Sequence, residues 1–281
     1  MRFVAVGDVM VDVVCLQLPP PSARVHAEVS MHAGGSAVNA AAAAVAAGSS
    51  AAVMGRIGSD PPGDLVAAEL EMLDIEAHLA RDQQLPTGIA ISLGDDPSSP
   101  SVVANRGANA RLSPEDIPDV LEADALLVSG FALFQTGSSE AAQTALDRFG
   151  GSWVGVDVSS PRLAAAERDF QFGEEGRRTV VLATADEART MTGQEPEEAV
   201  RTLASRFSVA CIKLGEQGAL AAVGDLVERG VVDPVARRSP FGAGDAFGAA
   251  LLVALAAGTP LGRALDLACA AGARAAGSSP G

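Results

Sequence analysis

Short apolar runs alternate with helical stretches along most of the chain. The apolar runs are rich in valine, leucine, isoleucine and alanine, and they read "FVAVGDVMVDVV", "SAAVMGRIG", "ADALLVSGF", "SWVGVDVS", "TVVLAT" and "VACIKLG". Such runs are typical of strands that a parallel sheet buries on both faces, and the first run predicts the first strand. Helical patterns separate them in "PPGDLVAAELEML", "SEAAQTALDRF" and "EPEEAVRTLASRF". This alternation predicts a doubly wound, mostly parallel α/β sheet flanked by helices.

Two stretches do not follow this rhythm. Residues 13–32 and 87–107 alternate between polar and apolar positions, as half-exposed antiparallel strands do, with turns predicted at "PPPS" and "GDDPSSPS". We expect them to form a small β lid together. The sequence has no internal repeat and no linker rich in proline or serine that divides it into halves. We therefore interpret residues 1–281 as a single α/β domain with two inserted pairs of lid strands.

Composition and charge exclude several classes of function. Of the 281 residues, 48% are hydrophobic and 20% are charged, which is the balance of a globular protein. The longest apolar stretch, near residues 249–257, is shorter than the roughly 20 residues that span a bilayer, so we expect a cytoplasmic protein without membrane contact or cleaved leader. The formal net charge of −15 argues against broad contact with nucleic acid. Three scattered cysteines suggest neither a disulfide framework nor a zinc site.

The stretch "SPFGAGDAFG", residues 239–248, places a Gly-Ala-Gly turn directly before an alanine-rich helix. The amides of Gly242, Ala243 and Gly244 have no partner inside that helix, and they lie where the helix dipole favours an anion. Glycine also lets a phosphate approach the backbone and allows positive φ angles. These three residues therefore predict an anion hole.

Asp245 follows this turn. Beside a bound phosphate, a carboxylate is useful as a general base that takes a proton from an attacking hydroxyl. The alternative is that Asp245 only stabilises the helix N-terminus and that the glycines only make a tight turn. A second glycine pair, Gly34 and Gly35, precedes another alanine-rich helix, and Asn39 lies one turn into it, able to hydrogen-bond a polyol. Such a pair also commonly serves packing alone, so these residues leave both interpretations open.

The pairing of "GGSAVN" near the start with "GAGDAF" near the end resembles the two signatures of the ribokinase-like (pfkB-type) carbohydrate kinases. The resemblance covers nearly the whole chain and includes "GRIGSDPPGDLVAAEL" with Gly58, Asp60 and Gly63, then "RGANARLSPEDI" and "KLGEQGAL". It implies a ribokinase-like fold, and transfer of the γ-phosphate of ATP, with Mg²⁺, to a hydroxymethyl group of a small carbohydrate.

The resemblance also implies roles for single residues. Asp245 would be the catalytic base, and the amides of Gly242, Ala243 and Gly244 would hold the transferring phosphate. The acceptor side would be lined by Asp12, at the end of the first strand, together with Gly34, Gly35 and Asn39. The nucleotide side would include Thr184, Glu187, Gly215 and Gly218, with Glu187 organising magnesium through water.

Two departures from the family pattern affect the ions. Where the family usually has Asp-Thr before Gly-Ala-Gly-Asp, this chain has Ser239-Pro240-Phe241. The carboxylate that helps many relatives to bind a monovalent cation is therefore missing, and potassium activation is in doubt. Thr184 stands where the family commonly has asparagine, while Glu187 remains. We expect weaker organisation of magnesium and no outright loss.

For several further residues the sequence allows both a functional and a structural interpretation. Arg106 could reach an acidic or phosphorylated acceptor, or it could be a solvated strand residue. Arg237 and Arg238 could touch ATP phosphates or only face the abundant acids. Asp157 could hydrogen-bond the substrate or cap the following turn. None of His26, His32 and His78 shows metal-ligand spacing, and His32 is interpreted as a lid residue.

Two other functions stay open. The protein could be a nucleoside kinase of the same family, or a ligand-binding relative with impaired catalysis. Other phosphate-binding classes are disfavoured, because the sequence has no Gly-Lys-Ser/Thr loop and no correctly spaced dinucleotide fingerprint. The expected partner is a small sugar or sugar-like molecule. A homodimer through the lid is a further expectation, with Val25, Val29 and Ile91 facing either a partner or the substrate.

Overall fold

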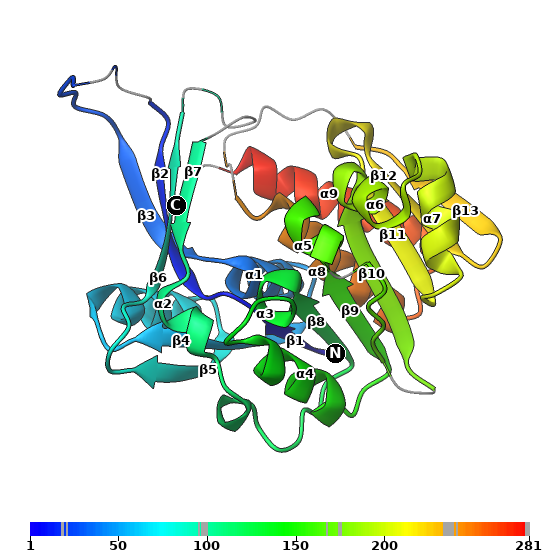
Figure 1. Cartoon of the computed structure of the whole chain (residues 1–281), viewed down its shortest axis with the longest axis horizontal. Helices are drawn as coiled ribbons and strands as arrows, with labels where there is room; N and C mark the ends of the chain where they lie inside the picture. Colours follow the sequence, from blue (N-terminus) through cyan, green and yellow to red (C-terminus); the bar gives the residue numbers. More distant parts are fainter. Residues whose placement is uncertain are drawn as a thin grey trace.

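The computed structural model describes residues 1–17, 20, 22–94, 96, 101–166, 168–173, 176–232, 239 and 241–278. Within these residues the chain forms one nine-stranded sheet, covered by helices on both faces, and a separate four-stranded sheet beside it (Figure 1). The predicted turn regions of the lid and Arg237, Arg238 and Pro240 lie partly or wholly outside the described residues.

The large sheet is mostly parallel, as predicted. Its strands are β1 (Arg2–Val6), β4 (Ser50–Gly58), β5 (Ile75–Asp82), β8 (Ala125–Ser129), β9 (Trp153–Asp157), β10 (Arg178–Thr184), β11 (Val209–Lys213), β12 (Ala219–Val223) and β13 (Leu226–Gly230). The order is β13-β12-β11-β10-β9-β8-β1-β4-β5, and only β12 and β13 run antiparallel to their neighbours. The chain leaves β1 toward β4 on one side and returns to β8 on the other. Ligands bind at the carboxyl ends of the strands beside such a switch point.

Buried side chains alternate between the two faces of this sheet. One face packs against α1 (Ser36–Ala46), α2 (Pro61–Met72), α8 (Ala243–Ala256) and α9 (Leu261–Gly277). The other packs against α3 (Gly130–Leu133), α4 (Ser139–Arg148), α5 (Pro161–Ala166), α6 (Ala185–Thr192) and α7 (Pro196–Ala204). Short 3-10 helices lie at η1 (Gly107–Arg111), η2 (Pro114–Asp116) and η3 (Gly215–Gln217). The predicted doubly wound architecture is therefore confirmed.

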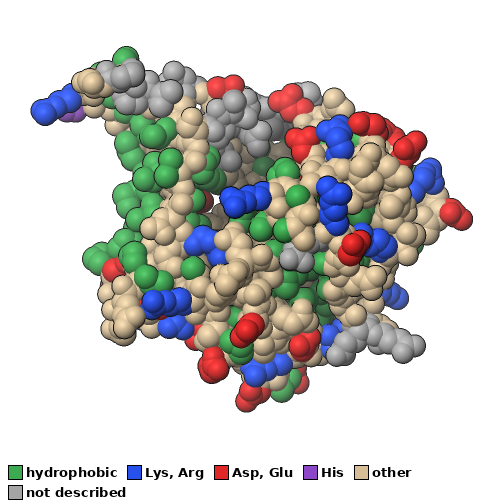
Figure 2. All heavy atoms as spheres, in the orientation of Figure 1, with side chains coloured by type: hydrophobic (Ala, Val, Ile, Leu, Met, Phe, Trp, Pro, Cys, Tyr) green, Lys and Arg blue, Asp and Glu red, His purple; other side chains and the backbone are tan. Residues whose placement is uncertain are grey.

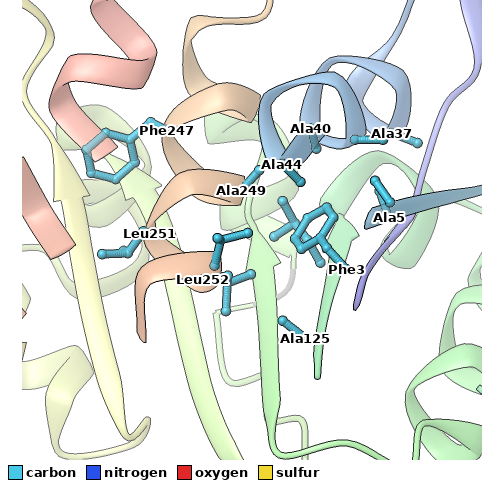
Figure 3. Close-up of a cluster of buried hydrophobic side chains, with 14 of the residues drawn as sticks. Phe3, Ala5, Ala37, Ala40, Ala44, Ala125, Phe247, Ala249, Leu251 and Leu252 are labelled. Atoms are coloured by element: carbon cyan, nitrogen blue, oxygen red, sulfur yellow. The ribbon is translucent and has the colours of Figure 1, made fainter. Parts of the chain in front are cut away.

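Helices α1 and α8 lie close together because their facing positions are small. Ala40 and Ala44 of α1 and Ala249 of α8 point into the cluster that contains Phe3 and Leu252 (Figure 3). Alanine has little side-chain volume, so the two helix axes can approach while the core stays filled. The packing fixes the relative position of the two helix N-termini, which matters for the site below.

The four-stranded lid sheet consists of β2 (Met10–Cys15), β3 (Val29–Gly34), β6 (Gly88–Leu93) and β7 (Ser101–Asn105), in the order β3-β2-β6-β7. Asp12 lies opposite His32 and Ala90 on one face, while Val13 lies opposite Met31 and Ile91 on the other. Strand residues that face each other across a ladder share a face. The lid therefore has an Asp12 face and an outer face that carries Ile91.

One prediction about the first strand is wrong. The run "FVAVGDVMVDVV" forms two strands in two sheets, β1 and β2, and Asp12 lies in the middle of β2 instead of at the end of the first strand. The break lies at Gly7, where a Cβ would stand 2.6 Å from Oγ of Ser36. The chain can change sheets there because glycine leaves room for the start of α1. Among the described residues, no helix has the length and apolar character needed to cross a membrane.

Candidate active site

The N-termini of α1 and α8 meet at the carboxyl edge of the large sheet. Gly35 precedes α1 with φ +86°, and Gly242 precedes α8 with φ +83°. Only glycine adopts this region freely, and at Gly35 a side chain would also strike the carbonyl oxygen of Asp8. Asn39 of α1 donates a hydrogen bond from Nδ2 to Oδ2 of Asp245, at 3.0 Å. The two glycine turns of the sequence thus form one site.

Asp12 reaches this site from the lid. Its side chain is buried, and its carboxylate accepts a hydrogen bond from the backbone amide of Gly35. A Cβ at Gly34 would collide with this carboxylate, so the glycine keeps the space that Asp12 occupies. Burial and the negative charge of Asp245 raise the pKa of Asp12 to about 7, against the lowering effect of the Gly35 amide. The predicted acceptor residues Asp12, Gly34, Gly35 and Asn39 therefore lie together.

Asp245 lies half-buried in the first turn of α8. Burial raises the pKa of its carboxyl group to about 6, and Asp157 adds to this effect. The hydrogen bond from Asn39 and the charge of Lys213 act in the opposite direction. A carboxylate with a pKa close to neutrality can accept and release a proton at physiological pH, as a general base must.

A cavity of about 740 Å³ opens beside the first turn of α8. Its lining includes Gly215 and Gly218 after β11, Ala243 and Gly244 of α8, and apolar side chains from α8 and α9 such as Phe247. The volume falls in the range that holds a molecule the size of a nucleotide. The predicted nucleotide-side glycines therefore lie next to the predicted anion hole.

Thr184 and Glu187 cap helix α6. The amide of Thr184 donates to Oε2 of Glu187 at 2.7 Å, and the amide of Glu187 donates to Oγ1 of Thr184 at 3.3 Å. Burial and the nearby Asp157 raise the pKa of the Glu187 carboxyl group. The described residues contain no cluster of three or more His, Cys, Asp or Glu side chains that could hold a metal ion. An ion here would need ligands from a substrate, as Mg²⁺ on nucleotide phosphates has.

Arg106 is neither on a strand nor solvated. It follows β7 directly and forms a bidentate pair with the buried Asp8, with Nη2 2.7 Å from Oδ1 and Nε 2.9 Å from Oδ2. It also donates to Oγ of Ser138 at 3.1 Å. The pair joins the exit of the lid to the loop between β1 and β2. A substrate contact for Arg106 stays a prediction, and His32 lies on the lid as expected.

Sequence reasoning missed Lys213 and its pairing with Asp157. Lys213, the last residue of β11, places Nζ 2.5 Å from Oδ2 of Asp157, the last residue of β9. Oδ1 of Asp157 also accepts from the amide of Ser159 at 3.2 Å, so Asp157 caps the following turn, which was one of its two interpretations. The available signal was the position of both residues at the ends of parallel strands, which meet at one sheet edge.

The site combines amides at a helix N-terminus with a cavity the size of a nucleotide, at one edge of an α/β sheet. This arrangement is typical of enzymes that transfer phosphoryl groups. The family model described as pfkB family carbohydrate kinase matches residues 2–279, and the chain belongs to this family. It is a sugar or nucleoside kinase of the family. The family and enzyme class predicted from the sequence are therefore confirmed.

Three relatives illustrate the similarity. A 2-dehydro-3-deoxygluconokinase from Thermoproteus tenax is 28% identical over 97% of this chain and 87% of its own length. An ATP-dependent ribose-1-phosphate kinase from Halopiger xanaduensis is 30% identical over 87% of this chain and 80% of its own length. The crystal structure of adenosine kinase from Sinorhizobium meliloti superposes with a TM-score of 0.84 at 20% identity, covering 99% of this chain and 94% of that one. This last likeness concerns the fold, which agrees with the predicted ribokinase-like architecture.

Proposed function

We propose that the protein transfers the γ-phosphoryl group of ATP to a hydroxymethyl group of a small carbohydrate. The observation that carries this proposal is the hydrogen bond between Asn39 and Asp245, because it joins the acceptor side and the anion hole in one site. The name of the Halopiger xanaduensis relative, an ATP-dependent kinase, supports ATP as the donor. Both of the sequence relatives are named as kinases, one as a 2-dehydro-3-deoxygluconokinase and the other as a ribose-1-phosphate kinase.

In the proposed reaction, Asp12 and Asn39 orient the acceptor by hydrogen bonds to its hydroxyl groups. Asp245 takes the proton of the reacting hydroxyl while that oxygen attacks the γ-phosphorus and the bond to the leaving ADP oxygen breaks. The amides of Gly242, Ala243 and Gly244 stabilise the charge on the transferring group. The lid, which carries Asp12, covers the acceptor and keeps out water that would otherwise hydrolyse ATP.

The residues present also fit magnesium that arrives with the nucleotide. Mg²⁺ commonly keeps several waters and binds through one or two carboxylates plus substrate phosphates, so it needs no preformed cluster of protein ligands. Glu187 would contact such an ion only through water, because one of its carboxylate oxygens caps α6. When bound, the ion would supply positive charge toward the β- and γ-phosphates.

A coupled assay of ADP release tests this proposal directly. The acceptor panel contains sugars, sugar acids such as 2-dehydro-3-deoxygluconate, ribose 1-phosphate and nucleosides, each with ATP and Mg²⁺, with and without potassium. We expect release of ADP that depends on one class of carbohydrate. Turnover with nucleosides alone would instead establish a nucleoside kinase, and binding of ATP without turnover on any acceptor would favour a ligand-binding relative.

The variant Asp245→Asn tests the proposed base. Asparagine keeps the size of the side chain and an oxygen that can accept from Asn39, so binding of acceptor and ATP should change little. We expect kcat to fall by about 10²–10⁴-fold, the usual contribution of a general base. Full turnover in this variant would refute the role of Asp245 while leaving the kinase activity itself intact.

A further inference from the structure

Lys213 is the single lysine of the chain, and it lies at the candidate site. Its side chain is only 14% exposed and forms an ion pair with Asp157. Burial alone would lower the pKa of the ammonium group, but the carboxylates of Asp157 and Glu187 raise it overall. The group therefore stays charged at physiological pH, at a place that excludes most water.

The ammonium lies against the predicted anion hole. A Cβ built on Gly244 would stand 3.4 Å from Nζ of Lys213, so the glycine leaves the approach to this nitrogen open. An ammonium group has three hydrogens to donate. Among the described residues, the hydrogen-bond acceptor of Nζ is Oδ2 of Asp157. Hydrogens of Nζ are therefore left for a ligand that rests on the first turn of α8.

The charge balance of the site favours a ligand that is an anion. Four carboxylates, those of Asp12, Asp157, Glu187 and Asp245, interact with one another here or with Lys213. Of the described residues that line the cavity, Lys213 is the one with a positive charge, whereas Asp186 and Glu216 are acidic. Such walls alone would repel the phosphates of a nucleotide. A fixed cation at the anion hole removes part of that repulsion where the phosphate must lie.

We propose that Lys213 is a catalytic residue that donates a hydrogen bond to the transferring phosphoryl group, and that Asp157 positions it. The inference rests on the proposed function, because it assigns the first turn of α8 to the γ-phosphate. The ammonium and the amides of Gly242, Ala243 and Gly244 then contact the same group from two sides. Charge that builds on the phosphoryl oxygens during transfer meets a donor that is already in place.

Direct binding measurements separate this role from a structural one. The probes are the non-hydrolysable ATP analogue AMP-PNP and ADP, with Mg²⁺, measured by calorimetry on the full chain. In Lys213→Met we expect affinity for AMP-PNP to fall about tenfold or more and affinity for ADP to change much less, since only the analogue carries the third phosphate. With the acceptor found by the ADP-release assay, kcat should fall as well. Arg201→Met, which removes an exposed cation on α7, is the control for net charge and should change neither.

Lys213→Met leaves Asp157 buried without its partner, which can itself unfold the site. The double variant Asp157→Asn with Lys213→Met removes both charges and keeps the volumes. If Lys213 touches the phosphate, the double variant regains thermal stability but not affinity for AMP-PNP, and Lys213→Arg recovers part of that affinity. Recovery of both affinity and turnover in the double variant would overturn the proposal, because the ion pair would then matter only for structure.

The outcomes also separate this inference from the proposed function. If the wild type phosphorylates a carbohydrate and the Lys213 variants bind AMP-PNP normally, only the inference fails. If the wild type shows no turnover but AMP-PNP binding still depends on Lys213, the contact stands and the proposed reaction fails. If the wild type binds neither nucleotide, both are wrong.

Discussion

At the scale of single residues, Asp245 sets the pH dependence of the proposed reaction. Its carboxyl group has a pKa raised to about 6, mainly by burial, and only the ionised form can accept the proton of the acceptor. Below that pH the protonated form dominates, so kcat should fall by about tenfold per pH unit. Above it kcat should be level. Initial rates at saturating ATP and acceptor, from about pH 5 to about pH 8, check this expectation.

Asp12 provides an internal control for that profile. The charge of Asp245 raises the pKa of Asp12 to about 7, above the value of about 6 for Asp245, so Asp12 is protonated while Asp245 titrates. In Asp12→Asn the inflection of kcat near pH 6 should therefore stay in place while KM for the acceptor rises. An inflection that disappears in this variant would mean that the profile reports the titration of Asp12 instead of Asp245.

Gly242 and Gly258 allow a matched test of the anion hole, because they flank the same helix. Gly242 precedes α8 at φ +83°, and Gly258 follows it at φ +79° with open space around its Cα. Alanine at either position should cost about 1–2 kcal/mol of unfolding free energy, measured in urea. Only Gly242→Ala places a Cβ 3.2 Å from Cγ of Asn39, the residue that holds Asp245. We expect kcat to fall about tenfold or more in Gly242→Ala alone. Equal turnover in both variants would contradict a role for the turn in catalysis.

At the scale of elements, the capping box of α6 combines stability with the proposed magnesium role. Thr184→Ala removes the side-chain oxygen that accepts from the amide of Glu187, and should cost about 1 kcal/mol of unfolding free energy. Thr184→Asn keeps a good N-cap, so stability should stay close to that of the wild type. If Thr184 weakens the organisation of magnesium, the asparagine variant should reach half-maximal rate at a lower Mg²⁺ concentration. Magnesium titration of all three proteins decides this, and identical curves would exclude the effect.

The sequence predicts elements well where a pattern repeats and poorly where the chain changes sheets. The buried strands β4, β8, β9, β10 and β11 follow from their apolar runs, because a parallel sheet covered on both faces needs little else. The division of the first run into β1 and β2 does not follow, since valines continue through Gly7 and Asp8 without a change in pattern. Strands β5, β12 and β13 are not predicted from the sequence. Strands β12 and β13 pair through short antiparallel connections, with Lys213 opposite Ala219 and Val223 opposite Leu226, so they lie outside the alternation of parallel strands and helices.

For the whole molecule, the candidate site also has parts that the sequence predicts and parts that it does not. The glycine turns are local signals, and their association through Asn39 and Asp245 follows once two helices begin at one sheet edge. The pair of Lys213 and Asp157 is not local. These residues are 56 positions apart on strands that flank β10, so only the strand order brings them together. The pairing of Arg106 with Asp8 across 98 positions depends equally on how the lid is connected.

The last prediction concerns the assembly of two copies through the outer face of the lid. Met31, Val13, Ile91 and Val103 lie side by side across all four strands, opposite to the face of Asp12. Val103 is 66% exposed and Met31 53%, and Figure 2 shows hydrophobic side chains gathered over this region. Val29 and Ile91 therefore face away from the acceptor side. A continuous apolar row on a sheet is typical of a contact surface.

We expect this row to pair with the same row of a second copy, so that light scattering after size exclusion gives about twice the chain mass of 28.2 kDa. The double variant Met31→Glu with Val103→Glu should yield monomers, because each glutamate would be buried without a partner in a symmetric contact. Val120→Glu, at a valine that is 64% exposed outside the lid, is the matched control and should leave the mass unchanged. A wild type that stays monomeric at high protein concentration would exclude the dimer.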